Sequence, residues 1–196
     1  MGHYFINDEN LRSDIKKINI NFNNIQFVFS TDNGVFSKNE IDYGTELLIK
    51  TVLNEDINGD VLDLGCGYGP IGITINKIKN VSMDMVDLNE RAVLLTNLNI
   101  IENKCSNIQV FTSDGYSNIK KKYNYIISNP PIRVGKTKLY KLINDSFEHL
   151  FKDGIIYLVI RKEQGAKSFI KDFSTLFKIN ILKKSKGYYI ISLKKP

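Results

Sequence analysis

The sequence predicts an α/β fold in which a mostly parallel sheet of seven strands carries helices on both faces. Short apolar runs rich in valine and isoleucine alternate along the chain with segments of helical periodicity, as is typical of parallel sheets. Polar residues follow several of these runs directly, at the edge where a parallel sheet binds its ligands. The chain closes on two further runs joined by a Lys186-Gly187 turn, which predicts an antiparallel hairpin at one edge of the sheet.

The elements before the sheet form a short extension. Polar and apolar residues alternate over residues 18–22 and 25–29, so we expect an antiparallel pair of strands covering the N-terminus. Residues 41–53 are expected to form a helix that leads into the core. At 196 residues and 42% hydrophobic content, the chain is long enough for one buried core and short for two. We therefore expect a single domain over residues 1–196, with a β extension over 1–36 and the core over 37–196.

The core follows as alternating strands and helices. Asn89 precedes one helical segment and is a suitable N-cap. A later helix is indicated by apolar residues on one face: Leu139, Leu142, Ile143, Phe147 and Leu150. The expected strands cover 61–64, 81–86, 107–111, 123–128, 155–160, 178–182 and 188–193, and the other helices cover 71–78, 89–101 and the region around 169–173.

Four polar residues fall at the ends of these strands or just beyond them: Asp63, Asp87, Asp114 and Asn129. In open parallel sheets, ligands bind outside the carboxyl ends of the strands, near the point where the strand order reverses. The four side chains are therefore expected to converge on one site.

A glycine turn, Gly65-x-Gly67-x-Gly69, separates the first core strand from its helix. Glycines there let backbone amides approach a ligand at the helix N-terminus. The same arrangement serves NAD, FAD and S-adenosylmethionine, and some glycine turns bind nothing. Asp87 ends the next strand, where a carboxylate can accept hydrogen bonds from both ribose hydroxyls. Asp63 stands two residues before the first glycine, where dinucleotide folds usually keep an apolar residue, and this favours S-adenosylmethionine over NAD.

The tetrapeptide Asn129-Pro130-Pro131-Ile132 is suited to N-methylation. The lone pair of an exocyclic amine on a base is delocalised into the ring, so the amine is a poor nucleophile until both N–H groups are held. The Asn129 side-chain oxygen and the Pro130 carbonyl can accept those two hydrogen bonds, and the paired prolines fix the backbone. The same acceptors stabilise the positive charge that grows on nitrogen during transfer. The structural alternative is a rigid turn that closes a strand.

These motifs in this order resemble the class I S-adenosylmethionine-dependent methyltransferases, which have a Rossmann-like fold. The segments 32–37 (Asp-Asn-Gly-Val-Phe-Ser) and 41–45 (Ile-Asp-Tyr-Gly-Thr) are similar to those of the bacterial guanine-N2 methyltransferases of small-subunit (16S) ribosomal RNA, in their short single-domain form. The resemblance runs from about Asn33 to the C-terminus.

The resemblance implies S-adenosyl-L-methionine as cofactor and a role for each matching residue. The glycine turn would lie against the methionine part, Asp87 would bind the ribose and Asp114 the adenine amine, and Asn129 and Pro130 would be catalytic. The complete expected cofactor set is Asp63, Gly65, Cys66, Gly67, Gly69, Asp87, Leu88, Asp114, Gly115 and Asn129; the expected substrate-binding residues are Pro131, Ile132, Arg133 and Lys136. Ile132 departs from the pattern, because many amine methyltransferases place an aromatic ring there to stack on the target base.

The charge of the chain favours a phosphate-bearing partner. Its 27 Lys and Arg residues exceed its 21 Asp and Glu residues, for a net charge of +6. One cationic run directly follows the tetrapeptide: Arg133, Lys136, Lys138 and Lys141. The runs at 120–122 and 183–186 are interpreted as solvated turns. The expected partner is ribosomal RNA or the small ribosomal subunit, while the oligomeric state stays open.

The remaining composition indicates where the protein works. Cys66 and Cys105 are too few for a disulfide framework or a zinc site, and His3 and His149 have no partner at metal-ligand spacing. No secretory or membrane-spanning run is present, so we expect a cytoplasmic protein that binds neither metal nor membrane.

Several alternatives stay open from sequence alone. Another NH₂ group, in a different RNA or on a protein glutamine, offers the same chemistry to the tetrapeptide. From other classes, a nicotinamide oxidoreductase would bind NAD(P) and leave the tetrapeptide unexplained. A non-catalytic RNA-binding module would keep the fold without turnover.

Overall fold

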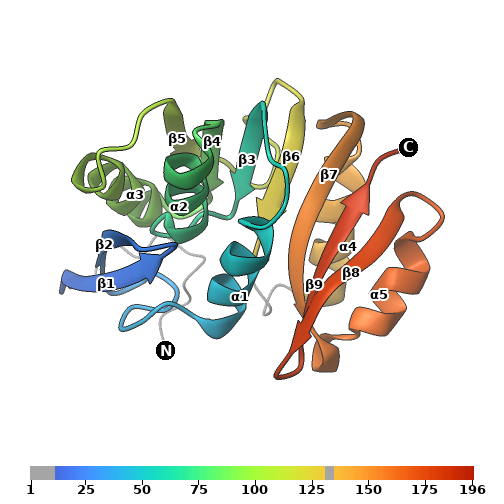
Figure 1. The fold of residues 1–196 in the computed structure, drawn as a ribbon, viewed down its shortest axis with the longest axis horizontal. Coiled ribbons are helices and arrows are strands. Elements are labelled where there is room, and N and C mark those ends of the chain that lie inside the picture. Colours follow the sequence, from blue (N-terminus) through green and yellow to red (C-terminus); the bar gives the residue numbers. More distant parts are fainter. Residues whose placement is uncertain (1–11, 131–134) are drawn as a thin grey trace.

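The computed structural model describes residues 12–130 and 135–196 (Figure 1). The helices are α1 (Tyr43–Val52), α2 (Pro70–Lys79), α3 (Glu90–Glu102), α4 (Gly135–Ser146) and α5 (Ala166–Phe173). The strands are β1 (Lys16–Phe22), β2 (Ile25–Thr31), β3 (Asp60–Leu64), β4 (Ser82–Asp87), β5 (Ile108–Thr112), β6 (Tyr123–Ser128), β7 (Leu150–Arg161), β8 (Lys178–Ser185) and β9 (Tyr188–Lys194). A short 3-10 helix, η2 (Lys162–Gln164), follows β7.

Strands β3 to β9 form one seven-stranded sheet in the order β5-β4-β3-β6-β7-β9-β8. The first five strands of that order are parallel, whereas β9 is antiparallel to both β7 and β8. The chain moves outward from β3 to β5 and then returns to β6 on the other side of β3. The strand order therefore reverses between β3 and β6. This confirms the predicted sheet and its C-terminal antiparallel hairpin.

Helices cover both faces of the sheet, which explains the continuous apolar runs of its central strands. In β7, Tyr157 and Val159 belong to the core cluster that contains α1, α2 and α3. The alternating residues Ile156, Leu158 and Ile160 belong to a second cluster with α4 and α5. In Figure 1, α1 lies in front of the sheet and α4 behind it.

The predicted N-terminal pair is confirmed as the antiparallel hairpin β1–β2. The outer edge of β2 is closed by two carboxamides from α3 instead of by another strand. Asn103 Oδ1 accepts from the Val28 N–H at 3.0 Å and its Nδ2 donates to the Val28 carbonyl at 2.8 Å. Asn99 makes the same pair of bonds with Ser30, at 2.7 and 3.0 Å. An exposed strand edge is thereby satisfied without a partner strand.

Several element boundaries differ from the prediction, among them the end of β8, which lies at Ser185 and not at residue 182. Helix α1 begins at Tyr43, not at residue 41, because Asp42 has an extended backbone and caps the helix by accepting from the Thr45 N–H. Helix α4 ends at Ser146, and Leu150 belongs to β7, where it pairs with Tyr123.

The early start of β7 was missed because Asp153-Gly154 has the composition of a turn. The strand absorbs this dipeptide as an irregularity, with Asp153 at a φ of 62° and a register shift opposite. Within residues 12–130 and 135–196, no helix combines the length and apolar character needed to span a membrane.

Candidate active site

The candidate site lies at the carboxyl ends of β3, β4 and β6, next to the point where the strand order reverses. These ends point toward the lower side of the molecule in Figure 1. β3 is paired with β4 on one side and with β6 on the other. The Ser128 hydroxyl at the end of β6 donates to the Leu64 carbonyl at 2.7 Å, which ties the ends of β6 and β3 together.

The glycine turn, residues 65–69, joins β3 to α2. The backbone N–H groups of Gly65 and Cys66 both donate to the Val86 carbonyl at 2.9 Å. On the far side, Thr96 Oγ1 donates to the Gly67 carbonyl at 2.8 Å. Gly65 and Gly67 have φ values of 78° and 59°, and a Cβ atom at either would meet nothing within 4 Å. Val86 and Thr96 therefore fix the turn through hydrogen bonds, while the space at the Cβ positions of Gly65 and Gly67 is open. A ligand could approach the backbone closely there.

The Cys66 side chain points into the protein. Its Sγ lies 3.8 Å from Thr96 Oγ1, and burial raises the pKa of the thiol well above its ordinary value. Only the backbone of Cys66 is therefore available to a ligand.

Asp63 is a fully buried carboxylic acid at the end of β3. Its Oδ2 accepts from the Gly72 N–H in the first turn of α2 at 2.8 Å. Its Oδ1 is buried and has no hydrogen-bond partner among the described residues. Burial raises the pKa of Asp63 to about 7, and the nearby Asp87 acts in the same direction. An unpaired buried acceptor beside an open glycine turn is a feature that a cationic ligand group would satisfy.

Asp87, the last residue of β4, is oriented by two backbone groups. Its Oδ2 accepts from the Gly67 N–H at 2.8 Å and its Oδ1 from the Asn89 N–H at 2.9 Å. Burial raises the pKa of this carboxyl above its usual range, although both hydrogen bonds oppose the shift. The next residue, Leu88, is an exposed apolar side chain, with 44% of its surface accessible.

Asp114 and Gly115 follow β5 and lie close to the same strand end. The Ser113 N–H donates to the Asp87 carbonyl at 2.9 Å, so this loop begins beside Asp87. Asp114 is exposed, and Gly115 has a φ of 55°. The structure thus brings the predicted cofactor residues that end or follow β3, β4 and β5 to the same end of the sheet, where the carboxyl ends of these strands lie.

Asn129 directly follows β6, and its carboxamide is held by residues of α1. Its Nδ2 donates to Asp42 Oδ2 at 2.9 Å and to Thr45 Oγ1 at 2.7 Å. Because a carboxylate can only accept, the NH₂ group must face Asp42, and the Oδ1 atom must face the other way. No described residue donates a hydrogen bond to that oxygen.

Asp42 and Thr45 also bind each other, since the Thr45 hydroxyl donates to Asp42 Oδ2 at 2.8 Å. Sequence reasoning gave neither residue a role at the site. An aspartate before a helix indicates a cap, and nothing local shows that the same carboxylate reaches a residue 87 positions away.

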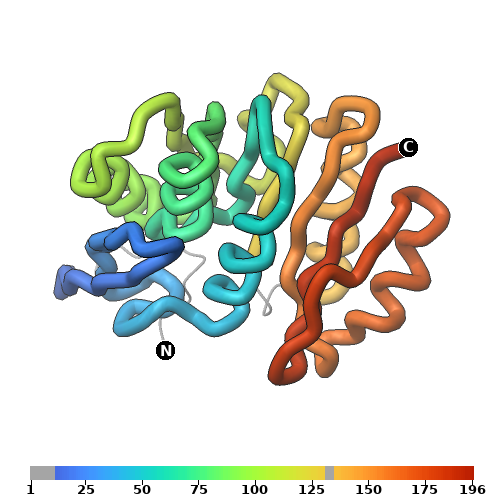
Figure 2. The backbone as a smooth tube through the Cα atoms, in the orientation of Figure 1, coloured from blue at the N-terminus to red at the C-terminus, as the bar shows by residue number. Residues whose placement is uncertain are grey.

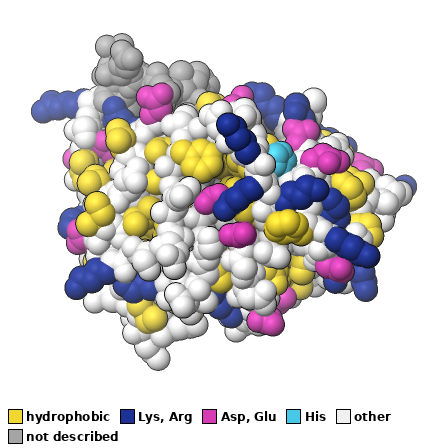
Figure 3. Space-filling model, turned by 90° about the horizontal axis from the view of Figure 1, so that it is seen from above, with side chains coloured by type: hydrophobic (Ala, Val, Ile, Leu, Met, Phe, Trp, Pro, Cys, Tyr) yellow, Lys and Arg dark blue, Asp and Glu magenta, His cyan; other side chains and the backbone are white. Residues whose placement is uncertain are grey.

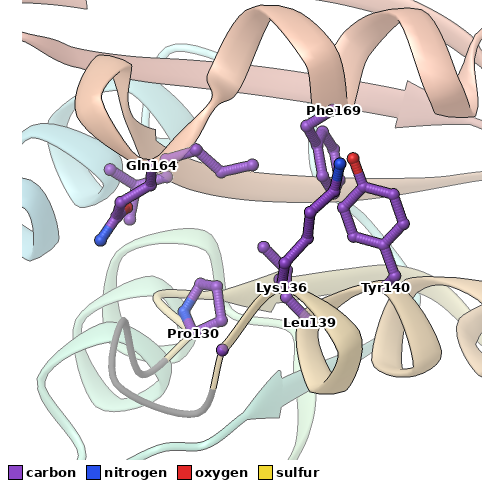
Figure 4. Close-up of a pocket in the computed structure, with 9 residues that line it drawn as sticks. Pro130, Lys136, Leu139, Tyr140, Gln164 and Phe169 are labelled. Atoms are coloured by element: carbon purple, nitrogen blue, oxygen red, sulfur yellow. The ribbon is translucent and has the colours of Figure 1, made fainter.

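Pro130 lines a cavity of about 170 Å³ beside the site (Figure 4). The other walls come from the start of α4, the end of β7, η2 and α5. The Gln164 side chain lies across from Pro130, and its Nε2 is buried without a described partner. Gln164 was not predicted, because a glutamine in a polar stretch carries no local signal.

Lys136, predicted to bind substrate, also lines this cavity but its charge is partly neutralised. Its Nζ lies 3.6 Å from Asp172 Oδ2 and 4.7 Å from the centre of the Tyr140 ring. In Figure 4 it extends beside Tyr140 toward Phe169. The predicted substrate residues Pro131, Ile132 and Arg133 lie outside the described residues.

Comparison with known proteins identifies the family. Residues 26–192 match the family model described as methyltransferase small domain. The chain is 40% identical over 197 residues to the uncharacterized protein YbxB of Bacillus subtilis, covering 98% of each. It is 33% identical to the ribosomal RNA small subunit methyltransferase C of Psychromonas ingrahamii, covering 91% of this chain and 51% of that protein. For the protein of the same name from Mannheimia succiniciproducens the identity is 43%, covering 64% and 39%.

The fold is similar to that of a solved structure, the T. thermophilus 16S rRNA N2 G1207 methyltransferase (RsmC) in complex with AdoMet and guanosine. The TM-score is 0.81 at 21% sequence identity, and the match covers 93% of this chain and 51% of that chain. The chain thus spans about half the length of the named methyltransferases that it matches, although it spans nearly all of YbxB.

Fold and site together define a class I S-adenosylmethionine-dependent methyltransferase. The chain belongs to the methyltransferase small domain family, whose model covers most of its length. The residues at the strand ends fit this cofactor: the unpaired Asp63 oxygen, the open space beside Gly65 and Gly67, and the exposed Leu88 next to Asp87.

Proposed function

We propose that the protein transfers a methyl group from S-adenosylmethionine to the exocyclic N2 amine of a guanine in small-subunit ribosomal RNA. The observation that carries this proposal is the orientation of Asn129. Asp42 and Thr45 occupy its NH₂ group, so its Oδ1 atom is left as a fixed acceptor for a donor from outside. A substrate amine is such a donor.

The cofactor would be held by the ends of β3, β4 and β5. Asp63 and the backbone of the glycine turn would face its methionine part, and Asp87 would accept from its ribose hydroxyls. Leu88 would pack on the adenine, while Asp114 and Gly115 would border the adenine edge. When bound, S-adenosylmethionine supplies an electrophilic methyl carbon attached to a positively charged sulfur.

Asn129 Oδ1 and the Pro130 carbonyl would accept the two N–H groups of the guanine amine. Holding both hydrogens turns the nitrogen lone pair out of conjugation with the ring and toward the methyl carbon. As the new C–N bond forms and the C–S bond breaks, positive charge on nitrogen is stabilised by the two acceptors. The product nitrogen then releases one proton to water, so the chain needs no separate general base.

The relatives support ribosomal RNA as the substrate. Two of them are named ribosomal RNA small subunit methyltransferase C, and the solved structure described above is a complex with AdoMet and guanosine. The net charge of +6 suits an RNA partner.

The test is methylation of unmodified small-subunit ribosomal RNA, or of small subunits assembled from it, by the wild type and by Asn129→Ala. Nucleosides are analysed by mass spectrometry after digestion. We expect N2-methylguanosine from the wild type and a loss of at least about 100-fold in rate for the variant, as for other preorganised hydrogen-bonding groups. Calorimetry should give cofactor affinities within about threefold of each other, because nine of the ten residues in the expected cofactor set lie outside the substituted position.

Asn97→Ala is the matched control, since Asn97 is exposed on α3 and its side chain bonds, among the described residues, only to the Val93 carbonyl of its own helix. It should methylate as the wild type does. Unchanged activity of Asn129→Ala would refute the catalytic assignment. A methylated glutamine or a different nucleoside as the sole product would refute the substrate.

A further inference from the structure

The turn of the β8–β9 hairpin carries a group of cations at the end of the sheet where Asn129 lies. This hairpin turn is at the lower end of the molecule in Figures 1 and 2, as is the start of α1. We call the group the hairpin patch; it comprises Arg161, Lys162, Lys183, Lys184 and Lys186. The four lysines are exposed, and Arg161 is half-buried.

The hairpin patch is joined to the first turn of α1. The hydroxyls of Tyr43 and Ser185 are hydrogen-bonded at 2.7 Å. The rings of Tyr43 and Tyr188 have centroids 5.5 Å apart. At Gly44, a Cβ atom would lie only 2.7 Å from Tyr188 Cε1, so the hairpin packs directly on the helix backbone. At the hairpin turn, the Lys162 N–H donates to the Gly187 carbonyl at 2.7 Å.

The same turn of α1 holds Asn129. Asp42 and Thr45, which bind the Asn129 carboxamide, flank Tyr43 and Gly44 in the sequence. The hairpin patch therefore contacts the same turn of α1 that holds the proposed catalytic amide. The run at 120–122 differs, because it lies in the turn before β6 and its Lys121 is paired with Asp84 and Asp60.

Aromatic rings hold three of the cations in place, and one of these is Lys184, whose Nζ lies 5.0 Å from the centre of the Tyr189 ring. Lys186 Nζ lies 4.7 Å from the centre of the Tyr43 ring, and the Arg161 guanidinium lies 4.7 Å from that of Tyr188. Ser185 faces Tyr43, and Lys183, two residues earlier on β8, lies on the same face of the strand. Lys183, Lys186 and Arg161 thus form one side of the patch, toward α1.

Within residues 12–130 and 135–196, none of the five cations of the patch forms an ion pair, although the exposed Glu163 follows Lys162 in the sequence. The opposite end of the molecule differs, because there cationic and acidic side chains alternate (Figure 3). At that end Lys121 lies 3.0 Å from Asp84 and 3.7 Å from Asp60, and Lys194 pairs with Asp153 at 2.9 Å.

We infer that the hairpin patch binds the phosphate backbone of the RNA strand that carries the target nucleotide. This inference rests on the proposed function, and it assigns the docking of the strand to the C-terminal hairpin. Exposed cations beside an enzyme site bind phosphates through charge, release counterions and hold the strand without reading its sequence. The interpretation of the run at 183–186 as a solvated turn is replaced by this role.

The experiment compares the double variant Lys183→Gln, Lys186→Gln with the wild type. Binding of a fluorescein-labelled single-stranded oligouridine is measured by anisotropy over a series of salt concentrations. We expect about a tenfold loss of affinity at low salt and a plot of log affinity against log salt that is shallower by about 1.4, since each phosphate contact contributes about 0.7. Calorimetry with S-adenosylmethionine should give the wild-type affinity.

Lys120→Gln, Lys122→Gln is the matched control, because it removes the same charge from exposed positions in the turn before β6. Its salt dependence should stay within about 0.3 of the wild type. If both double variants lose affinity equally, net charge alone explains binding and the inference is overturned. If the hairpin variant binds as the wild type does, the inference is likewise overturned.

The two proposals fail in different ways. If the wild type forms no N2-methylguanosine but the hairpin variant alone loses oligouridine binding, the proposed reaction is wrong and the hairpin patch still binds RNA. If the wild type methylates guanine and the hairpin variant binds and methylates equally well, the reaction stands and the patch has no role in docking.

Discussion

Thr45 positions Asn129 through one hydroxyl, and this contact can be tested without touching the substrate. Thr45→Val removes the acceptor that lies 2.7 Å from Asn129 Nδ2 while keeping the shape of the side chain. One such hydrogen bond is worth about 1 kcal/mol, so we expect kcat to fall by roughly five- to tenfold. The KM for S-adenosylmethionine should change by less than about twofold, because Asn129 would still be held by Asp42. Steady-state methylation kinetics give both values.

Thr45→Ser is the control for that experiment, because it restores the hydroxyl and removes only a methyl group. We expect it to recover most of kcat. If serine and valine behave alike, packing at position 45 matters and the hydrogen bond does not.

The raised pKa of Asp63 makes the free energy of unfolding depend on pH, and it sets the sign of that dependence. Burial raises the pKa of Asp63 from its ordinary value of 3.8 to about 7. Between these values the folded protein keeps a proton that the unfolded chain has released, so the free energy of unfolding falls as the pH rises through this window. The contribution is fully present below 3.8, and the slope is at most about 1.4 kcal/mol per pH unit.

Urea denaturation of the wild type and of Asp63→Asn, from about pH 5 to about pH 8, measures this effect, since asparagine cannot titrate in that range. The free energy of unfolding of the wild type should fall relative to that of the variant as the pH rises to about 7. Above that pH the two stability curves should run parallel. Parallel curves over the whole range would mean that the Asp63 pKa is not raised.

At the scale of single elements, α3 secures both the N-terminal hairpin and the glycine turn. Besides closing the edge of β2, Asn99 donates to the Tyr68 carbonyl at 2.7 Å. Asn99→Ala would leave three buried backbone groups without partners. We expect the free energy of unfolding to drop by about 2–4 kcal/mol, because each unsatisfied buried group costs about 1–3 kcal/mol and some will reach water. Asn97→Ala on the exposed face of the same helix should change it by less than about 0.5 kcal/mol.

Chemical denaturation of both asparagine variants decides this prediction. Equal destabilisation by the two substitutions would mean that helix propensity, and not the bonds of Asn99, sets the loss. Hydrogen exchange of Asn99→Ala gives a further check. If exchange becomes faster only within residues 16–31, the hairpin opens separately from the rest of the protein.

Most elements could be predicted because their signals are local. The apolar strands, the glycine turn and the Asn89 cap are each specified by residues adjacent in the chain. The true length of β7 and the edge-closing role of Asn99 and Asn103 could not be predicted in this way, because each depends on a partner far along the chain and spacing within one segment carries no information about such partners. The start of α1 differs, because its Asp42 cap is a local signal that the predicted boundary did not use.

The residues of the candidate site also fall into those that could be predicted and those that could not. Strand ends bring Asp63, Asp87 and the Asn129 segment together, as parallel topology requires. Asp42 and Thr45 escaped prediction because their contact with Asn129 joins separate elements. The expected division into a β extension and a core, and the roles given to the site residues, stay predictions.

At the scale of the whole molecule, cofactor binding should stabilise the fold, because the site is assembled from three strand ends. S-adenosylhomocysteine at about 100 times its Kd should add about 2.7 kcal/mol to the free energy of unfolding. Differential scanning fluorimetry should show a matching rise in Tm that grows with ligand concentration. The same concentrations of NAD should give no shift, whereas a shift with NAD alone would favour an oxidoreductase.

Gly44 carries none of the proposed binding or reacting groups, yet it sets the distance between the hairpin and α1. A Cβ atom at position 44 would lie 2.7 Å from Tyr188 Cε1, so any side chain there would push the Tyr188 ring away from the helix. Alanine there would leave every proposed binding and reacting group in the chain, and would shift the hairpin patch relative to the Asn129 carboxamide.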